Sequence, residues 1–239
     1  MNPQFSQKIQ ADFDQIAQLQ TLRWDHNSHY HPFLLKQLPA QCPNVLEVGC
    51  GGGEFSRLLA QRAESVTAID LSPAMIERAK RNSLTYPHLQ FQIADILEWE
   101  IPNEQFDAIP PRRIASRIAS IATIHHIPLE TLLPRLKAAL KPGGKLLILD
   151  LVKNAQLQDF LFDFVAVPLN WILQFWYNRR FRPTPEAISL WREHIRTDEY
   201  LTLSQAKQLY SQYLEGAIVR RHLFWRYSMV WQKPFRGKL

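Results

Sequence analysis

The stretch "NVLEVGCGGGEFSRLLA", from Asn44 to Ala60, constrains the fold more than any other part of the chain. It joins an apolar, strand-like run to an amphipathic helix through a loop rich in glycine. In a doubly wound α/β sheet, the first strand-to-helix turn lies in a crevice beyond the carboxyl ends of the strands, where missing side chains let a ligand contact the main chain. The stretch therefore predicts a nucleotide-like ligand on a mostly parallel sheet.

This glycine loop does not fit the two common phosphate-binding motifs. A dinucleotide fingerprint needs glycines at relative positions 1, 3 and 6, but counting from Gly49 the third of these positions is Glu54. The Glu54 carboxylate would also repel a pyrophosphate at a helix N-terminus. The loop lacks the Lys-Ser or Lys-Thr pair of a P-loop. Because Glu47 precedes it, the loop instead suits a nucleoside that carries a cationic tail.

Two further acids stand where the second and third predicted strands end. Asp70 closes the run 65–70 and can accept hydrogen bonds from both hydroxyls of a ribose. Asp95 closes the run 89–95 and can accept from an exocyclic amine of adenine. Either acid alone could equally be a helix cap, but three acids around one glycine loop favour a ligand site.

Strand-like runs alternate with helix-period segments, which is typical of a sheet covered by helices on both faces. We expect strands at 44–48, 65–70, 89–95 and 145–151, a fourth strand that starts at 106–109, and helices at 55–63, 72–82 and 129–140. Long helical segments follow Val152. The chain then closes with two strand-like runs about a turn at Phe224–Arg226.

Composition limits the class of protein. With 239 residues, 46% of them hydrophobic, the chain fits one α/β domain. Cys42 and Cys50 form no CxxC pair, so we expect neither a disulfide framework nor a bound metal. The N-terminal stretch does not resemble a secretory signal, so we expect a cytoplasmic protein. Residues 170–239 are strongly basic, which fits either an anionic partner or a solvated face.

Five segments together carry a resemblance to the class I S-adenosylmethionine-dependent methyltransferases: "VLEVGCGGG", "AIDLSPAMIERAK", "IADI", "SIATIHHI" and "LKPGGKLLILD". The resemblance implies an α/β fold with a doubly wound, Rossmann-like sheet of seven strands in the order 3-2-1-4-5-7-6, with strand 7 antiparallel. It also implies S-adenosyl-L-methionine as the cofactor. We expect a single domain with these parts: a helical N-terminal lid at 1–43, a cofactor-binding core at 44–153, a helical insertion of substrate-side helices at 154–215 and a closing strand pair at 216–239.

The resemblance also implies a set of cofactor-binding residues. Gly49, Gly51 and Gly53 would pass under the methionyl part, Glu47 would face its ammonium group, and Asp70 would hold the ribose. The complete set is Tyr30, Glu47, Gly49, Cys50, Gly51, Gly53, Asp70, Leu71, Met75, Asp95, Ile96, Ser120 and Ile121.

The segment "RWDHNSHYHPFLLKQLP" resembles the lead-in segment of small-molecule members of this superfamily. Its Trp24, His29, Tyr30 and His31 would form part of a lid, with Tyr30 contacting the cofactor. The alternative is an N-terminal helix that only packs on the surface.

Methyl transfer needs an in-line nucleophile, and a general base adds about 10²–10⁴-fold where the nucleophile carries a proton. His126 and His125 follow the fourth strand and are our candidates for that base. Both could instead have a structural role in the loop. His194 is a more distant candidate.

We expect residues 154–215 to determine the acceptor. The segment "LQDFLFDFVAVPLNWILQFWYNRRFR" is apolar and aromatic with a basic end, and polar residues interrupt it too often for a membrane-spanning helix. It could cover an apolar substrate, lie on a membrane surface or pack in the core. The function we expect is methyl transfer to a small, partly hydrophobic acceptor. The alternatives are a tRNA- or RNA-modifying methyltransferase and a non-catalytic cofactor- or partner-binding protein.

The segment 106–127 departs from the pattern of the family. Pro110 and Pro111 cannot lie inside a central strand, and the repeated "RIAS" suggests a local duplication. About nine residues, Pro110–Ile118, are surplus, since loops tolerate insertions. Either they loop out and the strand resumes at Ile118 or later, or Ile114–Ile121 replaces the strand. We expect deletion of Pro110–Ile118 to raise the melting temperature.

Overall fold

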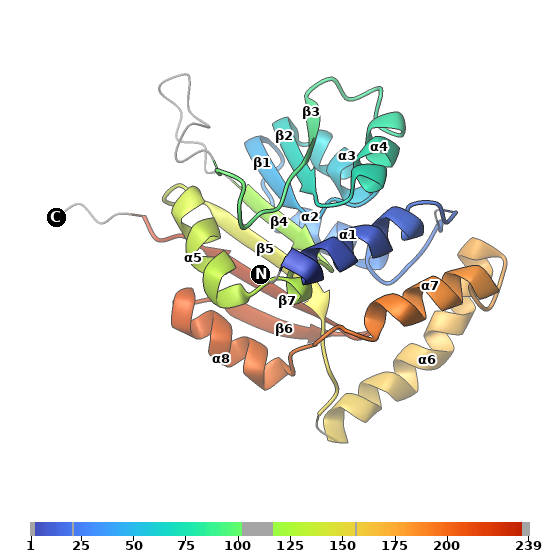
Figure 1. Ribbon diagram of the computed structural model, residues 1–239. Helices are drawn as coiled ribbons and strands as arrows, with labels where there is room; N and C mark the ends of the chain where they lie inside the picture. Colours follow the sequence, from blue (N-terminus) through green and yellow to red (C-terminus); the bar gives the residue numbers. More distant parts are fainter. Residues whose placement is uncertain (1–2, 21, 102–116, 156, 236–239) are drawn as a thin grey trace.

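The computed structural model describes residues 3–20, 22–101, 117–155 and 157–235, and these contain one seven-stranded sheet (Figure 1). Its order is β3-β2-β1-β4-β5-β7-β6. The last pair of strands, β6 and β7, is antiparallel, β7 also runs antiparallel to β5, and the other neighbours are parallel. The expected fold class, strand order and antiparallel seventh strand are confirmed. The strands are β1 (Cys42–Val48), β2 (Ala63–Asp70), β3 (Leu89–Ile93), β4 (Arg117–Ile121), β5 (Lys145–Leu151), β6 (Ile218–His222) and β7 (Arg226–Gln232).

Helices cover both faces of the sheet. Side chains of α2, α3 and α4 pack with Val45, Val66 and Leu147 on one face, and those of α5 and α8 pack with Leu46 and Ile148 on the other. Adjacent residues of a strand therefore pack on opposite faces of the sheet, because successive side chains of a strand point in opposite directions. The helices are α1 (Pro3–Ile16), α2 (His31–Lys36), α3 (Glu54–Ala60), α4 (Pro73–Arg81), α5 (Leu129–Ala139), α6 (Leu157–Asn178), α7 (Pro185–Ile195) and α8 (Leu203–Tyr213), with 3₁₀ turns η1 (Ser28–Tyr30) and η2 (Ile124–His126).

Helix α4 begins as its sequence predicts. Ser72 is the N-cap, and its hydroxyl accepts a hydrogen bond from the backbone N–H of Met75 at 3.1 Å. Pro73 occupies the first turn, where its missing N–H costs nothing. The cap fixes the point where the chain leaves β2, and it therefore positions Asp70 at the end of that strand.

Helix α1 joins the two halves of the molecule. The Ser72 hydroxyl donates to the Asp14 carboxylate at 2.5 Å, which ties α1 to α4. Two residues earlier on α1, a carboxylate oxygen of Asp12 lies 3.1 Å from Nδ1 of His194 in α7. In Figure 1, α1 lies between α4 and α7. We call this pair of contacts the α1 bridge.

Three expected element boundaries need correction. β3 ends at Ile93, so Asp95 lies in the following turn, where its Oδ1 accepts from the N–H of Leu97 at 2.9 Å. The last turn comprises residues 223–225, because Arg226 already pairs with Leu151 in β7.

The third correction concerns the surplus segment. Arg117 and Ile118 belong to β4, where they pair with Val45 and Leu46 of β1. The expected deletion of Pro110–Ile118 would therefore remove residues of a central strand. Residues 110–116 of the surplus segment lie outside the described residues, and so does the expected strand start at 106–109.

Candidate active site

The glycine loop lies between β1 and α3 and faces the end of β4. Gly49 has a φ of 74°, and a Cβ at this position would lie 2.0 Å from Oγ1 of Thr123. The opposing turn is itself strained, since Ala122 has a φ of 49°. Only glycine allows the two turns to approach this closely, and their approach forms the floor of the site.

Two carboxylates lie beside this loop, that of the buried Glu47 and that of the partly buried Asp70. Asp70 accepts from the N–H of Gly51 at 2.8 Å through Oδ2 and from the N–H of Ser72 at 2.9 Å through Oδ1. Burial raises the pKa of the Asp70 carboxyl, against the effect of these hydrogen bonds. Glu47 accepts from the Ser56 hydroxyl at 2.5 Å. Burial raises the pKa of Glu47 to about 8, because its charged form loses hydration.

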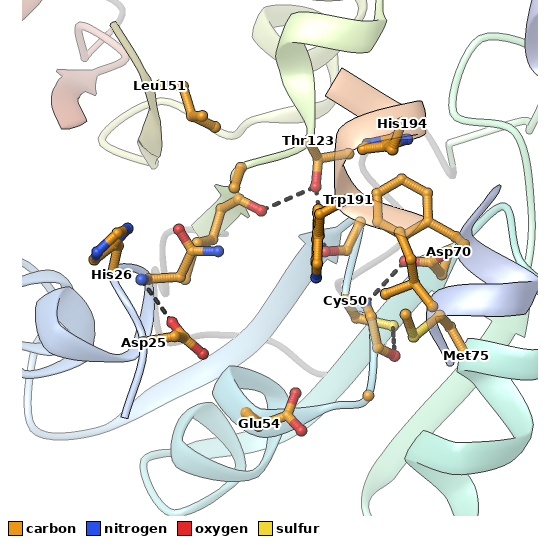
Figure 2. Close-up of a pocket in the computed structure, with 18 of the residues that line it drawn as sticks. Asp25, His26, Cys50, Glu54, Asp70, Met75, Thr123, Leu151, Trp191 and His194 are labelled. Carbon is orange, nitrogen blue, oxygen red and sulfur yellow. Dashed lines mark hydrogen bonds between the residues drawn. The ribbon is translucent and has the colours of Figure 1, made fainter. Parts of the chain in front are cut away.

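A cavity of about 1210 Å³ opens above the loop. Typical small-molecule pockets hold about 300–1,000 Å³, so this volume can hold two ligands side by side. Figure 2 shows Cys50 of the glycine loop and Trp191 of α7 facing the same space. Apolar side chains of α1 and α7, among them Phe13, Ile188 and Trp191, line the side opposite the loop.

Most of the predicted cofactor residues line this cavity. They are Glu47, Gly49, Cys50, Gly51, Asp70, Leu71, Met75, Asp95, Ile96 and Ile121. Three predicted residues do not. The Ser120 hydroxyl donates to the carbonyl of Val48 inside the sheet at 2.8 Å, and Gly53 is the N-cap of α3. The phenol of Tyr30 donates to the carbonyl of Leu223 at 2.9 Å, so it anchors the N-terminal segment to the β6–β7 turn.

The predicted lid residues are divided in the same way. His31 lines the cavity. Trp24 packs edge-on against Phe224, and its backbone N–H donates to Asn178 of α6 at 3.2 Å. His29 packs edge-on against both Tyr30 and Phe224. Trp24, His29 and Tyr30 therefore hold the N-terminal segment against α6 and the β6–β7 turn. His31 is the member of the predicted set that faces the cavity.

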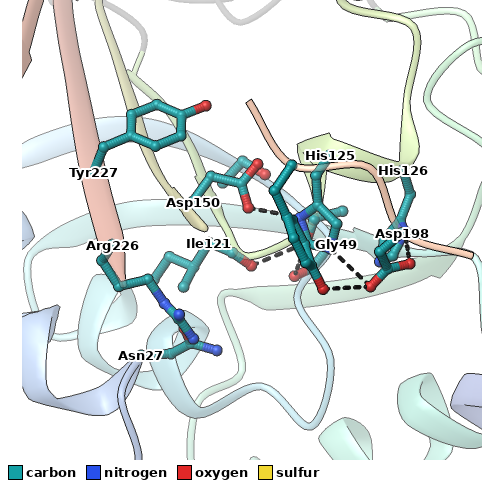
Figure 3. Close-up of polar contacts among 12 residues, drawn as sticks. Asn27, Gly49, Ile121, His125, His126, Asp150, Asp198, Arg226 and Tyr227 are labelled. Atoms are coloured by element: carbon teal, nitrogen blue, oxygen red, sulfur yellow. Dashed lines mark hydrogen bonds and ion pairs between the residues drawn. The ribbon is translucent and has the colours of Figure 1, made fainter. Parts of the chain in front are cut away.

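The two histidines after β4 belong to a buried polar group shown in Figure 3. Nδ1 of His125 lies 2.7 Å from Oδ1 of Asp150, the acid near the end of β5. Burial lowers the pKa of His125, but the carboxylates of Asp150 and Asp198 outweigh it, and the net shift is upward. Burial, together with repulsion from its histidine neighbours, lowers the pKa of His126 to about 2.

Asp198 was missed by the sequence reasoning. It lies in the loop after α7, and its Oδ1 is 3.4 Å from Nδ1 of His126. His194, on α7, lies 3.9 Å from the same carboxylate. Asp150 could have been found, because it is an acid near the end of a parallel strand like Asp70. Asp198 has no such local signal, since only tertiary packing brings it to β4.

Comparison with known proteins agrees with this geometry. The family described as "Methyltransferase domain" matches residues 45–144. The uncharacterized methyltransferase Rv0089 of Mycobacterium tuberculosis is 30% identical over 229 residues, which cover 88% of this chain and 98% of that protein. A ubiquinone biosynthesis O-methyltransferase of Xylella fastidiosa is 30% identical over 153 residues, 58% of each chain.

A solved structure shares the fold over the whole chain. The N-methyltransferase NodS of Bradyrhizobium japonicum, in complex with S-adenosyl-L-homocysteine, has a TM-score of 0.58 at 15% identity and covers 96% of this chain and 98% of its own. The full-length relative and the matched domain together establish the family. The chain belongs to the class I S-adenosylmethionine-dependent methyltransferases.

Proposed function

We propose that this protein transfers a methyl group from S-adenosyl-L-methionine to a small, partly hydrophobic acceptor. One observation carries the proposal: a single cavity is lined by the glycine loop with Asp70 on one side and by His125 and the apolar residues of α7 on another. The named relative in ubiquinone biosynthesis is consistent with a small acceptor. Membership of a methyltransferase family argues against a non-catalytic role.

The residues of the loop fit the cofactor. When bound, S-adenosyl-L-methionine supplies a sulfonium methyl group to a nucleophile. Each Asp70 oxygen already accepts one backbone hydrogen bond and has a second lone pair for a ribose hydroxyl. Glu47 is buried at the wall of the cavity. Among the described residues, no cationic side chain forms an ion pair with Glu47, whereas the neighbouring Glu54 pairs with Arg57. Glu47 can therefore receive an ammonium group.

The acceptor would lie between the loop and α7, beside the histidines. His125 is the better placed of the two predicted bases, because the bond from Nδ1 to Asp150 directs Nε2 away from that carboxylate and stabilises the protonated ring. Replacing His125 by Gln should lower kcat by about 10²–10⁴-fold and leave cofactor affinity close to that of the parent. Equal turnover in the two proteins would return His125 to a structural role.

Helix α6 indicates where the acceptor comes from. Its polar residues lie on one face, where Asp163 accepts from Asn154 at 2.6 Å and Asn170 bonds His26 at 2.9 Å. Its opposite face is exposed and apolar. That face carries Phe160, Leu161, Phe164, Val165, Trp171, Ile172, Phe175 and Trp176. A surface helix usually turns its apolar face toward the core, but α6 turns its apolar face toward solvent.

We propose that this apolar face lies on an anionic membrane surface. The segment Asp159–Asn178 is long and apolar enough to cross a membrane, yet its polar face is bonded to the N-terminal segment, which favours a helix lying in the interface. Arg179, Arg180 and Arg182 follow directly, and each basic residue near anionic lipid contributes about 1 kcal/mol. Trp191 and Ile195 of α7 are both partly exposed and line the cavity, so a lipid-soluble acceptor would enter from this side.

Vesicle sedimentation tests the surface. We expect binding to vesicles of phosphatidylglycerol and phosphatidylcholine, weaker binding to phosphatidylcholine alone, and release by salt. The variant Phe164→Ser/Trp171→Ser/Phe175→Ser should lose binding, whereas Leu84→Ser, which removes an exposed leucine on another surface, should keep it. If the parent ignores vesicles and instead forms a dimer that the triple variant abolishes, a second copy covers this face and the membrane proposal is wrong.

Methyl incorporation tests the reaction. The protein is incubated with methyl-labelled S-adenosyl-L-methionine and, separately, with a small-metabolite extract, a lipid extract and tRNA. We expect label in the metabolite or lipid extract. Label in tRNA alone would establish the RNA-modifying alternative, and no transfer from a cofactor that binds would restore the non-catalytic one.

A further inference from the structure

The polar group below the acceptor space has the composition of a metal site. His125, His126 and Asp198 each offer one ligand atom, and these atoms lie within 4.8 Å of one another. Nδ1 of His126 is 3.4 Å from Oδ1 of Asp198, and Nε2 of His125 is 3.8 Å from Oδ2. In a tetrahedral zinc site, bonds of about 2.0–2.2 Å place neighbouring ligand atoms about 3.4 Å apart. The separations are therefore longer than hydrogen bonds and close to those that one ion would bridge.

Hydrogen bonding within the protein does not account for this group. Both ring nitrogens of His126 and Oδ1 of Asp198 are buried without a hydrogen-bond partner. The His126 side chain is 5% exposed and that of Asp198 is 1% exposed. The other oxygen of Asp198 is occupied, because it accepts from the phenol of Tyr200 at 2.7 Å. Unsatisfied buried polar atoms destabilise a folded chain, and a ligand between His126 and Asp198 would satisfy atoms of both side chains.

Carboxylates lie behind two of the histidines in and beside this group, as is common around bound metal ions. The second nitrogen of His125 is bonded to Asp150 at 2.7 Å, and that of His194 contacts Asp12 at 3.1 Å. A carboxylate behind a histidine fixes its tautomer and turns the free nitrogen toward a metal ion. His194 also points its Nε2 at Asp198, 3.9 Å away, so it either orients that carboxylate or adds a fourth ligand. All of these residues except Asp12 and Asp150 line the cavity.

We propose that His125, His126 and Asp198 bind a divalent transition-metal ion, with Zn²⁺ the best match to two imidazoles and one carboxylate. Imidazole-rich sites favour zinc and its first-row neighbours, and three protein ligands leave a position for a further group. The expectation of no metal rests on the cysteines. The site proposed here uses no cysteine, and Asp198 joins the two histidines only in the folded chain. Binding of the ion does not depend on the proposed methyl transfer.

The catalytic consequence of the ion does rest on the proposed function. A hydroxyl acceptor that coordinates the ion loses its proton more readily. His125 then serves as a ligand through Nε2, and deprotonation of the acceptor no longer needs a free imidazole. An ion at this place would also join η2 to the loop after α7.

Metal binding is measured without cofactor or acceptor. The chain is stripped with a chelator, reconstituted with ZnSO₄ or CoCl₂, and analysed by elemental analysis, calorimetry and the cobalt absorption spectrum. We expect one ion per chain, a cobalt spectrum of low coordination number and a higher melting temperature. His126→Gln and Asp198→Asn should weaken Zn²⁺ binding by more than about 100-fold, and Asp150→Asn by about 10–100-fold.

The control is His88→Gln, whose histidine bonds the carbonyl of Ala60 outside the group. This variant should bind Zn²⁺ like the parent. The proposal is overturned if the natively folded parent takes up neither Zn²⁺ nor Co²⁺, or if His126→Gln and Asp198→Asn bind the ion as tightly as His88→Gln does. Because these readouts use no methyl donor, a failure here is separate from a failure of methyl transfer.

Discussion

Binding of the cofactor should release a proton from Glu47. Glu47 is 2% exposed, and burial, with smaller contributions from Glu54 and Asp70, raises its pKa to about 8 against the hydrogen bond from Ser56. With this pKa, Glu47 holds about 0.9 proton at pH 7 in the free protein. A cofactor ammonium beside it favours the carboxylate, and in the limit all of that proton is released.

The raised pKa of Glu47 predicts how the affinity for the cofactor depends on pH. Affinity for the protonated-ammonium form of S-adenosyl-L-methionine should rise about fivefold between pH 7 and pH 8, because the ionised fraction of Glu47 climbs from about 0.1 to about 0.5, and by less than about twofold more between pH 8 and pH 9. Calorimetric titration at pH 7 in two buffers of different ionisation enthalpy counts the protons directly. The Glu47→Gln variant should release almost none, whereas Glu64→Gln, on the exposed side of β2, should behave like the parent. Equal proton release by Glu47→Gln and the parent would refute the reasoning.

Three further outcomes follow from the same residues. Asp70→Ala should weaken cofactor binding by about 1.5–3 kcal/mol per lost charged hydrogen bond, measured by calorimetry against Glu64→Ala; equal affinities would remove Asp70 from the site. Gly216→Ala should cost about 1–2 kcal/mol of unfolding free energy for its φ of 79°, and Gly49→Ala about 1–3 kcal/mol more for its clash, as measured by urea unfolding; equal losses would show that the clash relaxes. Because the raised pKa of Glu47 means that the folded chain binds a proton that the unfolded chain has lost, the contribution of Glu47 to stability should fall from about pH 4.5 to pH 8, and the difference in stability between the parent and Glu47→Gln should show this fall in calorimetric scans.

Local sequence signals predicted the fold around the glycine loop well. The turn after β1, the cap at Ser72 and the acid at Asp70 each depend on neighbours within a few residues, so sequence reasoning places them correctly. The expected third strand was two residues too long, since it ended at Asp95 and β3 ends at Ile93; a turn and a strand end carry the same acidic signal. The position of Tyr30 outside the cavity had no local signal, because the carbonyl that its phenol bonds lies 193 residues away in the chain.

The acceptor side could be predicted only in outline. That the segment after β5 is helical follows from its composition, but the direction of its apolar face does not, since an apolar stripe fits a core and a surface equally well. The group around His126 depends on Asp198 and His194, which meet β4 only through the packing of α1 against α7. Such contacts have no periodic pattern in the sequence.

The α1 bridge has a consequence for the rate of turnover. Asp14 on Ser72 and Asp12 on His194 connect α1 to the start of α4 and to α7, so one helix is tied to both sides of the cavity. A movement that lifts α1 would then open both sides of the cavity together, for the spent cofactor and for the product of the proposed reaction. Lid motions of this kind take microseconds to milliseconds and often limit kcat. Weakening either end of the bridge should therefore speed product release and, with it, the steady-state rate, at the expense of water exclusion during the chemical step.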